Sequence, residues 1–225
     1  MSGRDTVLGK VRRALAVPAD DSRRRKAVAD RLAAADRGLI PARGKLDHGA
    51  QVDLFCTMAE KVQATTARVK STDDIPEAIA DYLRDRNLPA SLRMGEDKRL
   101  ADLPWDRTPS LERLSGPSDG RDMAGLSHAF GGVAESGTLM MTSGPDNPTT
   151  VNFLPDHHIV VIDGGDIAGD YETVWSRLRE AYGKGIMPRT VNMITGPSRS
   201  ADIEQTLLLG AHGPRSLHII VVDRG

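Results

Sequence analysis

Cysteine is nearly absent from this 225-residue chain, which contains Cys56 and no other. One thiol cannot form an internal disulfide. It also cannot supply the several thiolates that a cysteine-based zinc or iron–sulfur site built from this chain alone would need. We therefore expect no metal or cluster cofactor in this chain, and any iron–sulfur cluster must belong to a partner.

Net charge and long apolar runs are also lacking. Thirty basic residues stand against thirty-one acidic ones, and the formal charge of -1 gives no electrostatic argument for nucleic acid or a membrane surface. The opening stretch, MSGRDTVLGKVRRALAV, has no apolar core typical of a secretion signal. No run approaches the roughly 20 apolar residues of a membrane span. We expect a cytoplasmic protein.

Residues 1–50 are predicted to form an N-terminal helical segment and linker. Apolar residues at helical spacing indicate one amphipathic helix from Asp5 and a second within residues 20–36. The second helix carries a basic run at residues 23–26, but the aspartates around it favour a solvated helix face over a nucleic-acid site. Residues 51–225 are predicted to form one α/β domain.

The stretch Val191–Asp223 is interpreted as one βαβ unit. It consists of two apolar runs joined by a Gly-Pro-Ser-Arg-Ser turn, a short helical pattern and a Gly-His-Gly-Pro turn. Apolar runs without alternation indicate strands covered on both faces, and a crossover of this length joins strands in parallel. The ligand-facing end of such a unit is its first turn, Gly196–Ser200.

The middle of the chain supplies further elements. Helices are predicted at Ile75–Leu83 and from an Asp170 cap to Tyr182, and strands at Ala67–Val69, Ala90–Met94, Val133–Ala134, Thr138–Thr142, Thr150–Phe153 and His158–Ile162. The short spacings after residue 129 favour some antiparallel pairing. The sequence therefore predicts an α/β fold with a mixed, largely parallel sheet flanked by helices.

Residues 95–124 show little periodicity and several prolines, which predicts a long loop. Trp105 lies within it. We interpret this tryptophan as an anchor that holds the loop to the core rather than as a platform for substrate, because aromatic side chains bury large areas when they can.

The turn that contains Ser198 and Arg199 is a candidate anion site. It offers hydroxyls, a fixed positive charge and backbone N–H groups at the start of the expected helix. Asp202 and Glu204 in the first turn of that helix would neutralise the positive end of the helix dipole and repel an anion. A ligand-binding turn and a simple helix cap therefore remain equal alternatives.

Glu135 lies between small residues in GGVAESGT, where a turn can present a carboxylate to a ligand, with Ser136 and Thr138 beside it. It is a candidate base or nucleophile, and the alternative is an ordinary acid at a strand end. The spacing matches neither the Walker-type phosphate loop nor the dinucleotide fingerprint.

Histidines give weaker signals. His212 lies in a flexible Gly-Ala-His-Gly-Pro turn, where it can contact a ligand or merely close the turn. His157 and His158 are adjacent in an expected strand, so their side chains point to opposite faces and do not readily share a metal. Ser143 lacks the surroundings of a nucleophile elbow, which disfavours a serine hydrolase.

Three segments, GVAESGTLMMTSG, LPDHHIVV and TGPSRSADIEQTLLLGAHGPRSLHIIVVD, together resemble the lactate utilization protein C family, whose shared unit is the LUD domain. The resemblance implies an α/β fold similar to that of sugar-phosphate isomerases, CoA transferases and formyltetrahydrofolate cyclo-ligase. It also implies a role with two iron–sulfur partner proteins in oxidising L-lactate to pyruvate, with the clusters on those partners.

These observations lead to one main hypothesis and two alternatives. The main hypothesis is an accessory, small-carboxylate-binding subunit of a lactate-oxidising system, in which Ser198 and Arg199 face Glu135 and Arg199 pairs with the carboxylate. The first alternative is a CoA or acyl transferase with Glu135 as nucleophile. The second is a structural scaffold for the partner subunits. The site would consist of Glu135, Ser136, Thr138, Ser198, Arg199 and His212.

Overall fold

The computed structural model describes residues 2–16, 18, 20–34, 36–183, 185–201 and 207–223. The chain divides into two compact units, Met1–Leu39 and Ile40–Gly225. The first unit contains α1 (Gly3–Leu15), which begins with a capping box between Ser2 and Asp5, and α2 (Ser22–Ala34). Neither helix buries a residue. The linker expected at the end of residues 1–50, after the second helix, thus falls mostly in the second unit.

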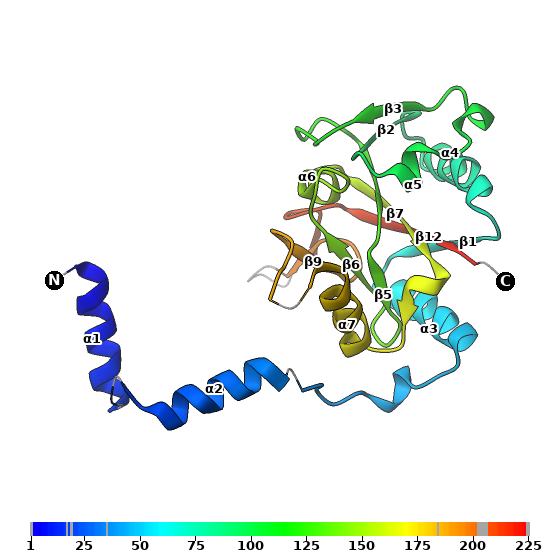
Figure 1. Cartoon of the computed structure of the whole chain (residues 1–225). Coiled ribbons are helices and arrows are strands. Elements are labelled where there is room, and N and C mark those ends of the chain that lie inside the picture. Colours follow the sequence, from blue (N-terminus) through cyan, green and yellow to red (C-terminus); the bar gives the residue numbers. More distant parts are fainter. Residues whose placement is uncertain are drawn as a thin grey trace. The chain divides into compact units, whose positions relative to one another are not determined.

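A six-stranded parallel sheet forms the centre of the second unit, with the strands in the order β1-β12-β7-β4-β2-β3 (Figure 1). The strands are β1 (Thr65–Val69), β2 (Ser91–Met94), β3 (Glu112–Ser115), β4 (Ala124–His128), β7 (His157–Asp163) and β12 (Ser216–Val222). The predicted α/β class with a largely parallel sheet is confirmed.

A second sheet has the order β8-β5-β6-β9. Its strands are β5 (Gly131–Val133), β6 (Thr138–Thr142), β8 (Ile167–Ala168) and β9 (Val191–Ile194). Here β6 pairs antiparallel with β5 and β9, whereas β5 and β8 are parallel. The antiparallel pairing expected after residue 129 therefore occurs in a sheet of its own.

Helices cover both faces of the parallel sheet (Figure 1). One face packs against α4 (Ile75–Asp85) and α5 (Lys98–Ala101), and the other against α3 (His48–Lys61) and the second sheet. The outer face of the second sheet packs against α7 (Tyr171–Tyr182). Along β7, Ile159 and Val161 face the first core while Val160 and Ile162 face the second, which explains the unbroken apolar run.

Local signals account for several helix ends. Asp170 accepts a hydrogen bond from the Thr173 backbone and caps α7, which ends before Gly183 as predicted. Pro76 lies in the first turn of α4, where its missing N–H has no intrahelical partner to lose. Short 3₁₀ turns complete the fold at Ala42–Gly44 (η1), Thr72–Asp74 (η2), Trp105–Arg107 (η3) and Gly164–Asp166 (η4).

The long segment 95–124 is held to the core by Trp105, as predicted. Its indole is buried, with 6% of the residue exposed, and Nε1 donates a hydrogen bond to the Leu100 carbonyl at 2.8 Å. Three short elements, α5, η3 and β3, lie within the segment.

The strand predicted at Thr150–Phe153 is wrong, because this segment forms the short helix α6 (Thr149–Phe153). Pro148 precedes the helix and its carbonyl accepts from the Val151 N–H, while the Val151 side chain is fully buried. A short apolar run with threonines favours a strand by composition, but packing against β4 and β7 decides the outcome.

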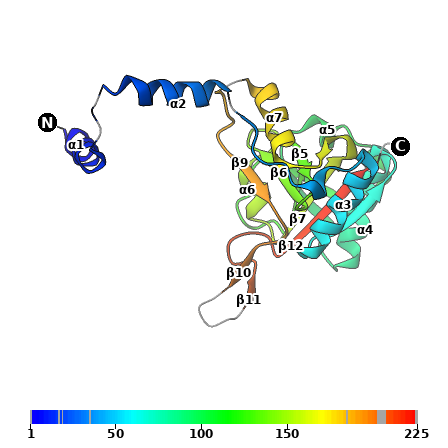
Figure 2. The same ribbon diagram turned by 90° about the horizontal axis from the view of Figure 1, so that it is seen from below.

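The βαβ interpretation of Val191–Asp223 is also wrong. Its first strand, β9, belongs to the second sheet and its last, β12, to the parallel sheet. Between them lie β10 (Arg199–Ala201) and β11 (Leu207–Leu209), which pair antiparallel and form a separate ribbon (Figure 2). Asp202 and Glu204, expected in a helix start, lie outside the described residues. The two apolar runs look similar in the sequence, so the sequence does not show that their strands belong to different sheets.

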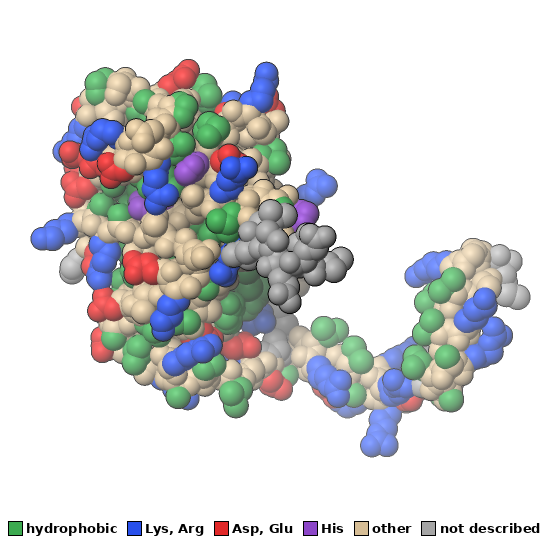
Figure 3. Space-filling view, turned by 180° about the vertical axis from the view of Figure 1, so that it is seen from behind, with side chains coloured by type: hydrophobic (Ala, Val, Ile, Leu, Met, Phe, Trp, Pro, Cys, Tyr) green, Lys and Arg blue, Asp and Glu red, His purple; other side chains and the backbone are tan. Residues whose placement is uncertain are grey.

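The surface agrees with the near-zero net charge. Figure 3 shows lysine and arginine interspersed with aspartate and glutamate on the face in view. No helix in the described part of the chain combines the length and apolarity that crossing a bilayer would require.

Two glycine turns lie directly against the end of α3. Gly137 has φ +65°, and a Cβ on it would lie 2.2 Å from the Ala59 nitrogen. Gly196 has φ +75°, and its Cβ would lie 2.3 Å from the Val62 carbonyl oxygen. Only glycine fits both the left-handed backbone and these close approaches. The two turns are thereby placed beside each other on one helix end.

We predict that Gly137→Ala destabilises the protein by about 3 kcal/mol or more, because the helix backbone cannot yield to the new methyl group. Gly120→Ala is the matched control: Gly120 also has a positive φ, +89°, but nothing lies within 4 Å of its Cβ position. It should cost only about 1 kcal/mol. Urea unfolding of both variants measures this, and similar losses would contradict the packing argument.

Candidate functional site

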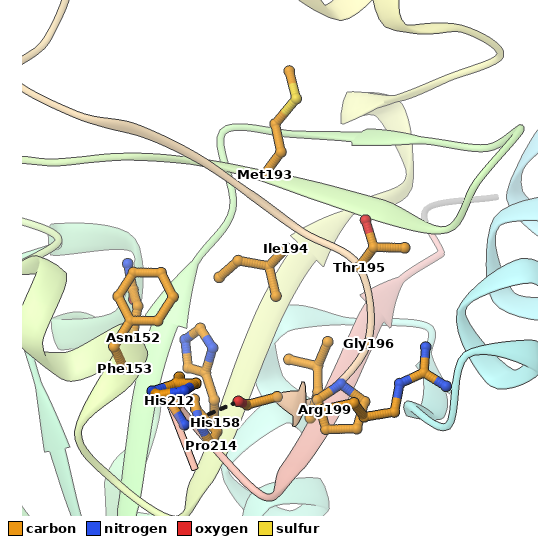
Figure 4. Close-up of a pocket in the computed structure, with 14 residues that line it drawn as sticks. Asn152, Phe153, His158, Met193, Ile194, Thr195, Gly196, Arg199, His212 and Pro214 are labelled. Atoms are coloured by element: carbon orange, nitrogen blue, oxygen red, sulfur yellow. Dashed lines mark hydrogen bonds between the residues drawn. The ribbon is translucent and has the colours of Figure 1, made fainter. Parts of the chain in front are cut away.

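A pocket of about 280 Å³ opens between the parallel sheet and the second sheet (Figure 4). Its walls come from α6, the start of β7, β9 with the following turn, and the turn that precedes β12. The lining residues are Asn152, Phe153, His158, Met193, Ile194, Thr195, Gly196, Pro197, Ser198, Arg199, His212, Gly213, Pro214 and Leu217.

A buried relay of three polar side chains reaches this pocket. The Ser127 hydroxyl on β4 donates to Asn152 Oδ1 on α6 at 2.6 Å and lies 3.2 Å from His158 Nε2 on β7. All three residues are buried, with at most 3% of each exposed. A serine hydroxyl has one proton, and here Asn152 accepts it. His158 Nε2 must therefore carry a proton and donate to Ser127.

Burial lowers the pKa of His158 to about 3, so its ring is neutral at physiological pH. With the proton on Nε2, Nδ1 is a hydrogen-bond acceptor. Neither His158 Nδ1 nor Asn152 Nδ2 has a hydrogen-bond partner among the described residues. Both atoms have almost no exposed surface, and an unsatisfied buried polar group costs about 1–3 kcal/mol.

Ser198 holds the opposite wall together. Its N–H donates to the Pro214 carbonyl at 2.8 Å, its carbonyl accepts from Gly210 N at 3.0 Å, and its hydroxyl accepts from His212 N at 3.3 Å. The turn before β10 is thus fastened to the turn before β12. Ser198, Arg199 and His212, all predicted as ligand-binding residues, line the same pocket. The Arg199 guanidinium points away from Asn152 and His158 in Figure 4.

Ser136 and Thr138 belong to a neighbouring cluster of hydroxyls. The Ser136 and Thr138 oxygens are 2.8 Å apart, and each lies 2.9 Å from the Tyr171 hydroxyl. Thr138 Oγ1 is also 2.7 Å from Thr195 Oγ1. The two turns that the sequence analysis expected to face each other therefore meet, through Thr138 and Thr195.

Glu135 lies outside the pocket. Its side chain is 5% exposed, and Oε2 is 3.5 Å from Arg43 Nε. The Glu135 N–H donates to the Gly169 carbonyl, and the backbones of Gly44 and Gly169 are in contact, which brings Arg43 to the carboxylate. The expected facing of Glu135 with Ser198 and Arg199 is not seen in the described residues: the partner of this carboxylate is Arg43.

The adjacent histidines point to opposite faces of the parallel sheet, as their spacing predicts. His158 takes part in the relay, whereas His157 Nδ1 lies 2.9 Å from the Tyr82 hydroxyl on the α4 side. Tyr82 also stacks on His218, with ring centroids 4.3 Å apart. Within the described ranges, no three His, Cys, Asp or Glu side chains are arranged to hold a metal ion.

A smaller polar pocket of about 100 Å³ lies at the carboxyl ends of β4, β7 and β12, where ligands of parallel sheets commonly bind. Arg99, His128, Asp163 and Asp166 are among its lining residues. Burial and the nearby Arg99 lower the pKa of His128, while burial and Asp163 raise the pKa of Asp166. Because Arg99 already binds Asp97 through two nitrogens, the acidic side chains dominate this pocket.

Sequence reasoning missed Ser127, Asn152, His158 and the smaller pocket. The relay joins residues 25 and 31 positions apart on three different elements, so no local motif marks it. Because residues 150–153 were predicted as a strand and form a helix, the direction of the Asn152 side chain was also not predicted. One signal was present: polar side chains inside apolar strands, such as Ser127 and His158, require buried partners.

Comparison with known proteins shows which class of protein this chain resembles. The profile of the LUD domain matches residues 121–222. A DUF162 family protein from Deinococcus radiodurans, known from a crystal structure, has the same fold, with a TM-score of 0.60, 20% identity, and coverage of 79% of this chain and 99% of that one. The second unit of this chain is therefore an α/β protein that is similar to the LUD domain over residues 121–222.

The particular relatives are lactate utilization protein C sequences. That of Geobacillus sp. strain WCH70 is 36% identical over 124 residues, which cover 53% of this chain and 50% of the relative. That of Bacillus subtilis strain 168 is 37% identical over 94 residues, 41% of this chain and 39% of the relative. The chain spans about half the length of the curated relatives it matches. The resemblance to the lactate utilization protein C family is confirmed, and the pocket and relay lie wholly inside the matched LUD domain.

We predict that the protein loses stability as the pH falls from about 6.5 toward 3. His158 has its pKa lowered to about 3 and His218 to about 4, so the unfolded chain binds protons first. Each histidine should contribute a slope of roughly 1 kcal/mol per pH unit within this window.

Urea unfolding of the wild type, His158→Gln and His218→Gln at pH 7, 6 and 5 measures these slopes. Each variant should show a shallower pH dependence than the wild type, whatever its stability at pH 7. Parallel slopes in all three proteins would contradict the assignment of buried neutral rings.

Proposed function

We propose that this chain is a small-carboxylate-binding subunit of a lactate utilisation system. The names of its relatives support the assignment to this system, since several relatives are called lactate utilization protein C. The pocket within the LUD domain supports the binding role, because it combines a polar floor with basic side chains at its wall.

The observation that carries the proposal is the pocket lining, which combines the exposed Arg199 with the polar side chains of Ser198 and His212. Apolar side chains, Phe153, Ile194 and Leu217, line the same pocket, so a bound polar group would be partly shielded from water. The pocket volume of about 280 Å³ lies below the usual range for drug-sized ligands. Its size suits a compact acid such as lactate.

Charge supports an anionic ligand. Among the described lining residues, the basic side chains besides neutral His158 are Arg199 and His212. Arg199 is exposed, so its long side chain can turn toward the pocket without leaving a buried partner unpaired. A guanidinium binds a carboxylate through two parallel hydrogen bonds, which is why we assign the carboxylate to Arg199.

Electron transfer in this proposal belongs to two iron–sulfur partner proteins that oxidise L-lactate to pyruvate. Cys56, the single cysteine, lies on α3 and is half-buried, and burial raises the pKa of its thiol. A thiol held in its neutral form is a poor cluster ligand or nucleophile. This chain would therefore bind a substrate or product while the partners carry the clusters.

The transferase alternative finds less support. A nucleophilic carboxylate needs space for an acyl group and its leaving group. Glu135 is buried against Arg43 and is absent from the linings of the described pockets. This geometry does not favour Glu135 as a nucleophile.

The proposal is tested by thermal unfolding and calorimetry with L-lactate, pyruvate and acetate. A ligand at ten times its Kd should stabilise the wild type by about 1.4 kcal/mol. Arg199→Ala should remove this stabilisation because the carboxylate loses its cation. Arg84→Ala is the control, since Arg84 is an exposed arginine on α4 that pairs with Asp81.

An unaltered response in Arg199→Ala would contradict the assignment of Arg199. No response of the wild type to any small carboxylate would contradict the binding role itself. Stable co-purification with the iron–sulfur proteins in that case would favour the structural scaffold.

A further inference from the structure

We propose that the pocket binds carboxylic acids with an apolar tail more tightly than it binds lactate. This inference rests on the proposed function, since it concerns the ligand of the same pocket. It adds the chemistry of the part of the ligand that Arg199 does not hold: a chain of a few methylene groups in place of the single methyl group of lactate.

The pocket is larger than lactate requires. A water molecule takes up about 30 Å³ in the liquid, so the cavity of about 280 Å³ has room for roughly nine of them. Lactate fits this volume but has only three carbon atoms, and it would leave part of the space to water. A ligand gains affinity when its own atoms replace water that lies against apolar side chains. The unfilled part of the pocket therefore decides which acid binds best.

Apolar side chains line much of that space. They belong to Phe153, Met193, Ile194, Pro197, Pro214 and Leu217. Phe153 and Ile194 are only half-buried, so part of their apolar surface is open to solvent. A hydrocarbon chain that covers this surface removes water both from the protein and from itself, which is the source of the hydrophobic gain.

The apolar wall lies apart from the cation. In Figure 4 the Arg199 guanidinium lies on one side of the pocket and the Phe153 ring on the other, with the Ile194 side chain between them. A carboxylate held by Arg199 would therefore direct the rest of its ligand past Ile194 toward Phe153. The longer the chain beyond the carboxylate, the more of this wall it covers.

Gly213 leaves space beside Phe153. It also lines the pocket, and a Cβ on it would lie 3.6 Å from Phe153 Cδ1 and 3.3 Å from Ser198 Cβ. The φ angle of Gly213 is not in the left-handed region, so the backbone conformation does not require glycine here. The missing side chain thus keeps the space between Phe153 and Ser198 open for a ligand.

The first test measures the affinity of the wild-type protein for straight-chain acids by calorimetry, from acetate through propionate and butyrate to pentanoate. Each methylene group that leaves water should tighten binding about threefold, so pentanoate should bind roughly 30-fold more tightly than acetate. L-Lactate and 2-hydroxyhexanoate are compared in the same way, and the longer hydroxy acid should bind more tightly.

Equal affinities along the series would overturn the inference while the proposed function stands. Binding that weakens with chain length would also overturn it, because it would mean that the pocket has no room behind the carboxylate. If none of the acids binds, the proposed function itself fails, and this inference fails with it.

The second test narrows the pocket with Gly213→Ala. The added methyl group occupies the space beside Phe153, so pentanoate should bind at least about threefold more weakly while acetate binds as before. Gly49→Ala is the matched control, since Gly49 is an exposed glycine on α3, outside the pocket lining, whose Cβ would make only an ordinary contact of 3.6 Å with Asp47 Oδ1. It should change neither affinity.

The third test removes part of the apolar wall with Phe153→Ala, which should lower the pentanoate-to-acetate affinity ratio. Phe130→Ala is the matched control: Phe130 is also half-buried, it lies outside the pocket lining, and its ring centroid is 6.3 Å from that of Tyr182. Acetate binding verifies that each variant is folded. A ratio that stays at the wild-type value in both Gly213→Ala and Phe153→Ala would overturn the assignment of the tail to this wall.

Discussion

The close contact of two glycine turns with the end of α3 is the constraint on which the rest of the structure depends. Gly137 directly precedes β6 and Gly196 follows β9, and both touch the backbone at the end of α3, between Met58 and the C-cap Val62. The helix itself packs on the parallel sheet through Phe55. These contacts therefore fix the second sheet against the first. A Cβ at either position would clash with this helix end, and at Gly196 it would also disturb the pocket lining.

Within that frame, burial decides the chemistry of the pocket. His158 would be an ordinary basic side chain on the surface, but complete burial holds it neutral, and the Ser127 hydroxyl then fixes its tautomer. The pocket wall carries the positive charge of Arg199, whereas the floor is lined by the neutral side chains of His158 and Asn152. The wall and the floor thus differ in character. They come from different elements, the turns before β10 and β12 on one side and β4, α6 and β7 on the other.

The sequence indicates most of the fold because its strongest signals are local. Asp170 and Gly183 mark the two ends of α7, and unalternating runs such as residues 158–162 mark strands covered on both faces. The residues of the site are less predictable, since their positions depend on contacts between distant elements. Ser198, Arg199 and His212 share a pocket as expected, yet Glu135 was assigned to them on turn chemistry alone, and Arg43, 92 positions earlier, is its partner. The runs at 191–194 and 216–222 look alike in the sequence, but no local pattern shows that they belong to different sheets.

The relay also bears on stability. A buried acceptor at His158 and a buried donor at Asn152 each cost about 1–3 kcal/mol when unpaired, and an apolar pair of similar shape would make a more stable core. Such a polar network is therefore unfavourable for folding alone. Ser127, Asn152 and His158 all lie within residues 121–222, the part of the chain that the LUD domain profile matches, so this cost arises in that part and not in α1 or α2.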